Sequence, residues 1–337
     1  MVINIGQIGV GAWGRNLLRN LTGLSDCRVV CCADISQAAL ERVKQIYPHI
    51  RVSQDPEGII ADPELDAVVI ATPPAGHFQM ASRALKSGKD VFVEKPLALS
   101  LQDAQELVRL SEGNGRILMV GHLMEYHPAL VQLKGYIEEG ELGDIYYIYS
   151  TRVNLGKIRR DENALWSFAP HDISMILYLL PDPPVRVTAV GQYYIQNGIE
   201  DVVFMTLHFR NGAMAHIHVS WLDPHKIRKL TVVGSRKMAV FDDTQSAEPI
   251  RIYDKGVEQG LDYQSYGEAL ALRMGDILIP RVKMSEPLRL ECEHFIDCVI
   301  HRRRPRSDGV DGLRVVRILD AAQRSMEAGG TPVEIAG

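Results

Sequence analysis

The first 34 residues combine a glycine-rich turn with the pattern of a strand, a helix and a second strand. An apolar run over Ile3–Ile8 ends at Gly9-Val10-Gly11-Ala12-Trp13-Gly14, and a helical pattern of leucines and a second apolar run ending at Asp34 follow. The first glycine permits a tight turn, the second lets a pyrophosphate approach the backbone, and the third lets helix and strand pack closely. This order of elements predicts a dinucleotide-binding βαβ unit.

Two features of this stretch indicate NAD as the dinucleotide. The amides that open the helix face a diphosphate, and the helix dipole favours negative charge there. Asp34 lies 20 residues after Gly14, where a carboxylate accepts a hydrogen bond from a ribose 2′-hydroxyl and repels the 2′-phosphate of NADP. The residues expected to bind NAD here are Gly9, Gly11, Ala12, Trp13, Gly14, Arg15, Asn16 and Asp34.

The alternation of strand and helix patterns continues to about residue 121. Apolar runs at Ala67–Ala71, Asp90–Val93 and Arg116–Val120 predict buried strands between amphipathic helices. Such alternation requires a doubly wound parallel sheet, whose ligand crevice lies at the carboxyl ends of the strands. Residues 1–121 are therefore expected to form an α/β Rossmann domain. The further cofactor contacts expected along its crevice are Thr72, Pro73, His77, Glu94, Lys95 and His122.

From residue 122 onward the pattern changes to strands in succession. Asn211-Gly212 between two β-rich runs is a strong hairpin signal. Lys255–Glu286 shows little periodicity and is expected to be a long, partly ordered loop. Amphipathic spacing predicts closing helices at Leu288–His301 and Gly312–Ala328. Residues 122–337 are expected to form an α+β domain with an open, mostly antiparallel sheet, for substrate binding and oligomerisation.

The composition excludes several classes of partner. A net charge of −5 argues against nucleic acid, and no apolar run approaches the roughly 20 residues that a membrane span needs. The chain opens on its first strand without the pattern of a signal peptide. The five cysteines are an odd number without zinc-ribbon spacing, so we expect reduced core thiols in the cytoplasm.

Apolar residues on both faces of the predicted sheet indicate self-association. Val203, Met205 and Leu207 alternate with Phe204 along one strand, so neither face is suited to water. We expect one face to cover the active site and the other to pair with a second subunit, giving a homodimer or homotetramer.

Three histidines near the Asn211-Gly212 turn suggest a metal site at first sight. A two-residue turn would pair Leu207 with His216 and Met205 with His218, and would point His208 to the other face. Two histidines without further ligands do not make a zinc site. The sequence therefore predicts no bound metal.

Lys95 is the main candidate for chemistry. It follows a buried strand at the ligand edge, between Glu94 and Pro96. A nearby nicotinamide cation and partial burial would favour the neutral amine, which accepts protons. The alternative is a lysine that only hydrogen-bonds the cofactor or the substrate.

Four motifs together resemble the glucose–fructose oxidoreductase/inositol dehydrogenase (Gfo/Idh/MocA) family: GVGAWG, Asp34, ATPP with His77, and EKPLALS. The resemblance covers essentially the whole chain, and it implies that the open-sheet domain carries a sugar site and oligomer contacts. It also implies that His171, in WSFAPHD, is a catalytic residue at the start of a helix. Many members have Asp four residues before this histidine, where this chain has Ser167. This departure shifts the proton-accepting role toward Lys95, with His171 as a partner of the substrate hydroxyl.

A cluster of cations in residues 149–160 provides the local positive charge that an anionic substrate needs in an acidic protein. A solvated loop is the alternative. The segments NLGKIRR and WSFAPHD resemble the branch that oxidises UDP-N-acetylglucosamine at C3, which implies supply of a PLP-dependent aminotransferase in lipopolysaccharide or surface-glycan biosynthesis. The expected substrate contacts are Lys95, Tyr126, Arg152, Asn154, Lys157, Arg159, Arg160, Trp166 and His171. Interdomain packing is an equal alternative for Tyr126 and for His122.

Other functions remain open from the sequence. The substrate could be UDP-N-acetylglucosaminuronate, a free sugar or inositol, and another branch of the family cleaves glycosides with transient use of NAD. A non-catalytic NAD(H)-binding regulator is the alternative of a different class. Lys95 and His171 argue against it, because a sensor has no need of a proton acceptor beside the nicotinamide.

Overall fold

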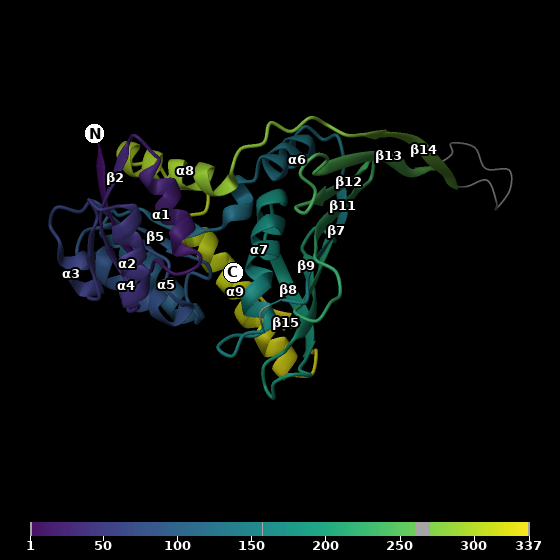
Figure 1. The fold of residues 1–337 in the computed structure, drawn as a ribbon. Coiled ribbons are helices and arrows are strands. Elements are labelled where there is room, and N and C mark those ends of the chain that lie inside the picture. The colour runs from purple at the N-terminus through teal and green to yellow at the C-terminus, as the bar shows by residue number, and fades with distance from the viewer. Residues whose placement is uncertain (1, 157, 260–269, 336–337) are drawn as a thin grey trace. The chain divides into compact units, whose positions relative to one another are not determined.

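The computed structural model describes residues 2–156, 158–259 and 270–335. The chain divides into two compact units (Figure 1). Unit 1 holds Met1–Tyr126 together with Ser285–Arg317, and unit 2 holds His127–Met284 together with Ile318–Gly337. This division differs from the contiguous split predicted at residues 121 and 122, because a late segment of the chain packs with the nucleotide-binding part.

Unit 1 contains a parallel sheet with the strand order β3-β2-β1-β4-β5-β6. Every neighbouring pair in it is parallel, and the order reverses between β1 and β4. This is the doubly wound arrangement predicted from the sequence, and it opens a crevice at the carboxyl ends of β1 and β4. The strands are β1 (Ile3–Ile8), β2 (Cys27–Ala33), β3 (Arg51–Ser53), β4 (Ala67–Ile70), β5 (Asp90–Glu94) and β6 (Leu118–Gly121).

Some helices of unit 1 begin at a capping side chain, whereas others have none. Ser36 accepts a hydrogen bond from the Ala39 amide, and Ser100 accepts one from the Asp103 amide. The helices are α1 (Gly14–Thr22), α2 (Gln37–Ile46), α3 (Pro56–Ala61), α4 (His77–Lys86), α5 (Leu101–Gly113) and α8 (Pro287–His301), with 3₁₀ turns η1 (Pro74–Gly76) and η2 (Leu123–Tyr126).

Helix α8 is part of the core of unit 1 although it comes from late in the chain. Its apolar side chains, among them Leu288 and Phe295, join one buried cluster with residues of β1 and α1. Phe295 packs edge to face on Phe92 of β5, with ring centroids 5.7 Å apart. Figure 1 shows α8 beside α1.

Unit 2 contains a second sheet with the order β14-β13-β12-β11-β7-β10-β9-β8-β15. Its pairs are antiparallel except for β7 with β10, which confirms the predicted mostly antiparallel sheet. The strands are β7 (Ile145–Val153), β8 (Pro184–Gln192), β9 (Val202–Phe209), β10 (Met214–Ser220), β11 (Ile227–Gly234), β12 (Met238–Asp242), β13 (Ile250–Gln259), β14 (Leu270–Leu278) and β15 (Val333–Glu334).

One face of this sheet is covered by helix and the other is open. Helix α7 (Ala164–Leu179) packs on β10, β7 and β9, and α6 (Pro128–Glu138) contacts α7 and β12. Figure 1 shows both helices on the same side of the sheet. Helix α9 (Gly309–Glu327) carries the chain from unit 1 into unit 2.

The loop predicted over Lys255–Glu286 is wrong for residues 255–259 and for Leu270–Leu278, which are strand, whereas residues 279–286 form neither helix nor strand. Strands β13 and β14 pair antiparallel, from Ile252 opposite Leu278 to Gln259 opposite Leu270. The ladder was missed because short polar residues interrupt the alternation. Residues 260–269 lie outside the described part of the chain.

The hairpin between β9 and β10 exists as predicted, but its predicted register is wrong by one residue. The Phe209 amide donates to the Ala213 carbonyl, which makes a three-residue loop with Gly212 at a φ of +89°. His216 therefore pairs with Thr206, and His218 with Phe204. A shift of one residue turns side chains to the other face, so His208 shares one face with His216 and His218.

Candidate functional site

The glycine turn after β1 has the geometry that a dinucleotide needs. Gly9 has a φ of +92°, and a Cβ there would lie 2.5 Å from the Ala71 carbonyl oxygen. A Cβ on Gly14 would overlap the carbonyl oxygen of Gly9. A Cβ on Gly11 would meet no described atom within 4 Å. The turn is thus closed on the protein side and open where a pyrophosphate would approach the backbone.

The start of α1 is suited to an anion. Its first residues have no side-chain cap, and no acidic residue lies in its first turn, so a bound phosphate would meet amide groups and the positive end of the helix dipole. Ala12, Trp13 and Arg15 are exposed on this turn, and Asn16 is half-buried. All the glycine-turn residues predicted to bind NAD therefore lie in one short segment.

Asp34 joins the glycine turn to the end of β2. Its Oδ2 accepts from the Val10 amide and its Oδ1 from the Ser36 amide, both at 2.8 Å. The carboxylate is half-buried, so its position is set by the backbone while part of it faces solvent. This placement fits a carboxylate that binds the ribose of NAD.

His77 holds two loops of the crevice together. Its Nδ1 lies 2.8 Å from the Pro96 carbonyl oxygen, and its Nε2 lies 2.9 Å from the Thr72 carbonyl oxygen. The ring is fully buried, and burial lowers its pKa. Thr72 is half-buried and Pro73 is exposed. The predicted direct contact of His77 with the cofactor has no support in this geometry, because both ring nitrogens face the protein backbone.

Glu94 and Lys95 end the neighbouring strand β5. The Glu94 carboxylate accepts hydrogen bonds from Trp13 Nε1 and from the Lys95 amide. Burial raises the pKa of Glu94 to about 7, although the Trp13 bond and the charge on Lys95 oppose this rise. Lys95 itself is half-buried. The indole of Trp13 thus ties the glycine turn to the strand end that carries Lys95.

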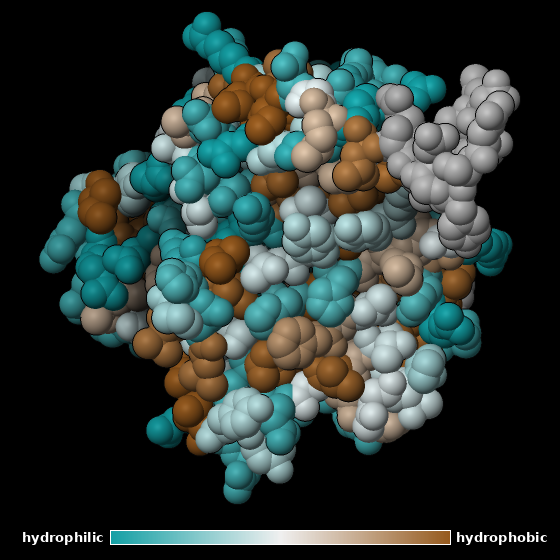
Figure 2. Space-filling model, turned by 90° about the vertical axis from the view of Figure 1, so that its right-hand side faces the viewer, coloured by the Kyte–Doolittle hydropathy of each residue, from teal (hydrophilic) through white to brown (hydrophobic). Residues whose placement is uncertain are grey.

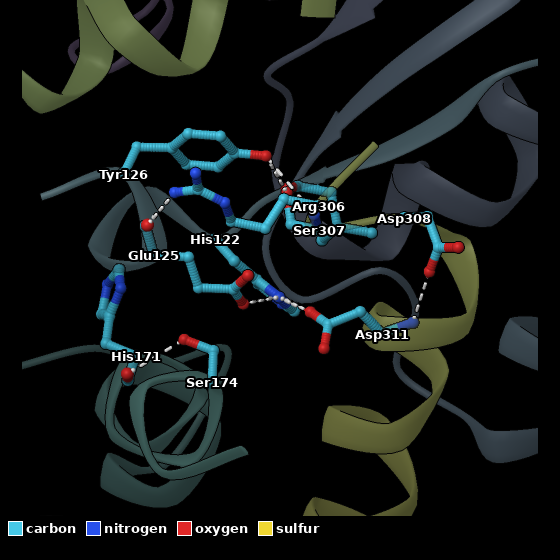
Figure 3. A network of polar contacts seen from close by, with 10 residues as sticks. His122, Glu125, Tyr126, His171, Ser174, Arg306, Ser307, Asp308 and Asp311 are labelled. Carbon is cyan, nitrogen blue, oxygen red and sulfur yellow. Dashed lines mark hydrogen bonds and ion pairs between the residues drawn. The ribbon is translucent and has the colours of Figure 1, made fainter. Parts of the chain in front are cut away.

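A buried charged cluster follows β6, in the region drawn in Figure 3. His122 Nδ1 lies 2.7 Å from Asp311 Oδ2 and 3.4 Å from Glu125 Oε1. Burial opposes a charge on His122, but the two carboxylates outweigh it and raise its pKa to about 10. This imidazole is therefore a cation held inside unit 1, and its Nδ1 is occupied by a proton.

Glu125, His122 and Asp311 have ligand atoms within 4.8 Å of one another. They are the one such group in the described part of the chain, and the strand histidines are not in it. In the structure these contacts are ion pairs between His122 and the two carboxylates. The absence of a bound metal stays a prediction.

The hydroxyl and the ring of Tyr126 also have partners within unit 1. Its hydroxyl lies 3.0 Å from Ser307 Oγ, and Arg306 stacks over its ring at 4.9 Å (Figure 3). The side chain is buried. These partners of Tyr126 and of His122 all lie within unit 1, and the predicted contacts of both residues with substrate and cofactor stay predictions.

Arg152 in unit 2 is not a free cation. Its Nε donates to Asp172 Oδ2 at 2.7 Å, and both side chains are buried. Ser150 Oγ donates to the other oxygen of Asp172 at 2.5 Å. This network links β7 to α7. The Arg152 guanidinium, which the sequence assigned to the substrate, therefore pairs with a carboxylate in the interior of unit 2.

The remaining predicted substrate residues lie on the segment after β7 and on α7. Asn154 and Arg159 are half-buried, Arg160 is exposed, and Arg159 pairs with Glu162 at 2.9 Å. Lys157 lies outside the described residues. Trp166 is in the first turn of α7, where its amide donates to Asn163 Oδ1. His171 is half-buried in the second turn, not at the helix start, and its carbonyl accepts from Ser174 Oγ.

Family models match both parts of the chain. Residues 3–122 match the oxidoreductase family with an NAD-binding Rossmann fold, and residues 130–240 match the Gfo/Idh/MocA C-terminal domain. The chain belongs to the Gfo/Idh/MocA family. The predicted family and the predicted cofactor NAD are both confirmed, and the protein is an NAD-dependent oxidoreductase of the class that acts on CH–OH groups.

Several relatives in this family match over nearly the full chain. The scyllo-inositol 2-dehydrogenase (NAD(+)) of Bacillus subtilis is 27% identical over 97% of this chain and 95% of its own. The UDP-N-acetylglucosamine 3-dehydrogenase of Acidithiobacillus ferrooxidans is 26% identical over 96% of this chain and 97% of its own. The solved structure of GnnA from that organism, of the same enzyme name, covers 98% of this chain and 100% of its own at a TM-score of 0.81 and 23% identity, which shows the shared fold.

No helix in the described residues is long and apolar enough to cross a lipid bilayer.

Sequence reasoning missed buried or half-buried acidic residues in both units, two of which pair with predicted site residues. Asp172, Glu291 and Asp311 are far from the glycine turn in sequence and lie inside helices. The available signal was an acidic side chain on the apolar side of a predicted helix, as for Glu291 between Leu288 and Phe295.

Proposed function

We propose that the protein oxidises the C3 hydroxyl of UDP-N-acetylglucosamine to the 3-keto sugar, as a cytoplasmic enzyme that supplies a PLP-dependent aminotransferase in lipopolysaccharide or surface-glycan biosynthesis. The near full-length similarity to a UDP-N-acetylglucosamine 3-dehydrogenase carries this proposal. The cations Arg159 and Arg160 after β7 support it, because a UDP-sugar carries a diphosphate. The five free, buried cysteines agree with a reducing compartment.

The proposed roles are those predicted from the sequence. The glycine turn, the start of α1 and Asp34 hold the cofactor, and bound NAD supplies the hydride acceptor. Lys95 accepts the proton of the C3 hydroxyl, and His171 positions that hydroxyl through a hydrogen bond. Asn154, Lys157, Arg159, Arg160 and Trp166 bind the nucleotide sugar.

Inositol is the second candidate substrate, because the scyllo-inositol dehydrogenase is as similar to this chain as the nucleotide-sugar enzyme is. An inositol carries no charge and would form no ion pair with Arg160. The uronate UDP-N-acetylglucosaminuronate would use one more cation near the sugar, which Arg159 could supply.

A panel of substrates separates these candidates. The purified protein is incubated with NAD and with UDP-N-acetylglucosamine, its uronate, other UDP-sugars, free sugars or inositols, and NADH absorbance is followed. We expect the largest kcat/KM with UDP-N-acetylglucosamine. Turnover of inositol alone would contradict the proposed substrate, and NAD binding without any turnover would favour a non-catalytic regulator. If NADH stays bound, quenched-flow detection of the 3-keto sugar replaces the absorbance.

Asp34 is expected to make the protein prefer NAD to NADP. A 2′-phosphate beside this carboxylate adds repulsion, and the three residues after it, Ile35-Ser36-Gln37, supply no cation. The measurement is kcat/KM for each dinucleotide, with the dissociation constants as a readout independent of turnover. Equal values for the two dinucleotides would contradict this prediction.

We further propose that the open face of the unit 2 sheet pairs with a second copy, giving a dimer or tetramer. Tyr147, Tyr149, Val190, Phe204 and Met214 are each at least 41% exposed there, whereas Val203, Met205 and Leu207 point to the buried face. The view in Figure 2 shows hydrophobic residues scattered among hydrophilic ones. The five exposed apolar side chains on this face are the residues that a second copy would cover.

Light scattering at micromolar concentration is expected to give a multiple of 37.6 kDa. Phe204→Asp should lower the mass toward that of the monomer, because a charge replaces an apolar ring at the interface. Ile46→Asp, at a 66% exposed position on α2, is the matched control and should leave the mass unchanged. A monomeric mass for the unmodified protein would refute the sheet-to-sheet assembly.

A further inference from the structure

Glu94 is the buried carboxyl group that lies directly before Lys95. Its carboxylate accepts from the indole of Trp13, which belongs to the glycine turn. Gly121 lies opposite it on β6, and a Cβ there would be 3.0 Å from the Glu94 carboxyl atoms. The carboxyl group therefore fills the space that a side chain at position 121 would need.

Glu291 on α8 faces the same interior of unit 1. It lies one helical turn before Phe295, which packs on Phe92, and Glu94 lies two residues beyond Phe92 on the same side of β5. Glu291 is fully buried, and neither of its carboxyl oxygens has a hydrogen-bond partner among the described residues. We refer to Glu94 and Glu291 as the carboxyl pair.

Two carboxylates in one buried site cannot both remain charged, because desolvation and mutual repulsion favour protonation. Burial and the nearby Glu94 raise the pKa of Glu291 well above its usual range. Burial raises that of Glu94 to about 7. One proton thus stays on the pair, and a second is exchangeable near neutral pH.

Other ionisable groups surround the pair. Lys95 and His122 favour the charged form of Glu94, and the Cys292 thiol lies beside Glu291. Beyond His122 lie Asp311 and Glu125, and burial raises the pKa of Glu125 to about 8. His122 keeps its charge between pH 6 and 8, since its pKa is about 10. Glu125 is therefore the neighbour that must be controlled for in this range.

We propose that the carboxyl pair releases its exchangeable proton to solvent when oxidised NAD binds, and keeps it when NADH binds. The oxidised nicotinamide ring carries a positive charge that the reduced ring lacks, while the phosphates and adenine are the same. A cation at the carboxyl end of β5 stabilises the ionised carboxylate. The O–H bond of the pair breaks, and no redox step is involved.

Binding calorimetry without any sugar tests this inference. Titrations at pH 7 in phosphate and in Tris, whose ionisation enthalpies differ, give the number of protons released. We expect about half a proton for NAD, because a group with a pKa near 7 is half protonated at pH 7, and none for NADH. The affinity for NAD should rise up to about tenfold per pH unit below pH 7 and level off above it.

Variants identify the source of the proton. Glu94→Gln, which retains an acceptor for Trp13, should abolish the release and flatten the pH dependence. Glu291→Gln should change the pH dependence little, because Glu291 stays protonated near neutral pH and does not repel the ionised Glu94. Glu125→Gln should leave the release unchanged, and Lys95→Met should retain it.

Several outcomes would overturn the inference. Equal proton release on binding of NAD and of NADH would contradict it. Release that persists in Glu94→Gln but disappears in Lys95→Met would also contradict it, because the lysine would then be the source of the proton. If Glu94→Gln does not fold, two measurements still decide: the comparison of the two dinucleotides on the unmodified protein, and the release that Lys95→Met is expected to retain. No sugar is present, so failure of the proposed substrate leaves this test unaffected.

Discussion

Lys95→Met is expected to lower kcat by at least about 10²–10⁴-fold, the range that general acid–base catalysis typically contributes. Methionine preserves the approximate size of the side chain but cannot accept a proton. NAD affinity should change little, since the glycine turn and Asp34 hold the cofactor independently of this side chain. KM should move less than kcat, because the lost interaction belongs to the transition state. Steady-state kinetics with UDP-N-acetylglucosamine and NAD titrations measure the two effects separately.

His171→Asn is the companion variant, and its loss should be smaller. The residue four positions earlier is Ser167, so no carboxylate stands at the position that would pair with the imidazole in many family members. The histidine then positions the substrate hydroxyl without acting as the base. The roles are exchanged if His171→Asn abolishes turnover while Lys95→Met retains more than about a tenth, a loss below the acid–base range. Near-normal rates in both variants would refute the mechanism.

The largest expected effect on stability is at Asp172. Asp172→Ala would leave the Arg152 guanidinium buried without its carboxylate, and would leave Ser150 Oγ with only its longer hydrogen bond to the Lys229 carbonyl. Removing one partner of a buried ion pair typically costs about 3–5 kcal/mol, because the other charge remains desolvated. We expect a lower midpoint of denaturant unfolding followed by fluorescence. His171 is the neighbouring residue, so turnover should fall as well.

Two controls test this explanation. The double variant Arg152→Met with Asp172→Leu removes both charges and should recover much of the lost stability, because apolar residues can replace a buried pair. Glu106→Ala breaks an exposed pair with Arg109 on α5 and should barely change the midpoint. If Asp172→Ala unfolds at the same denaturant concentration as the unmodified protein, the pair does not stabilise unit 2.

The sequence predicted unit 1 well because its signals are local. The glycine turn and the buried strand at Ala67–Ile70 each depend on a few neighbouring residues. The short helix α3, which Asp55 caps, was missed because six residues carry too little periodicity. The position of α8 in the core of unit 1 could not be predicted, because amphipathic spacing indicates a buried face but not the partner.

The candidate site was predicted in part for the same reason. Spacing placed Asp34 beside the glycine turn and Lys95 at the end of β5. Spacing could not distinguish a polar side chain that faces a ligand from one that forms an ion pair in the protein interior. Arg152 and His122 both form such buried ion pairs. Their partners, Asp172 and Asp311, lie on helices that are distant in sequence. The register of the hairpin was predicted wrongly because Gly212 adopts a positive φ, which makes the loop three residues long and not two.

The position of α8 in unit 1 also has a consequence for biosynthesis. When Tyr126 has left the ribosome, all six strands of the parallel sheet have been made, but Leu288 and Phe295 of its core have not. The apolar surface over β1, α1 and Phe92 therefore stays open while the whole of His127–Met284 is synthesised. Unit 1 can complete its core only after His127–Met284 has been synthesised, so this apolar surface is open to aggregation during that time. A fragment cut at residue 121 would carry the same exposed surface permanently.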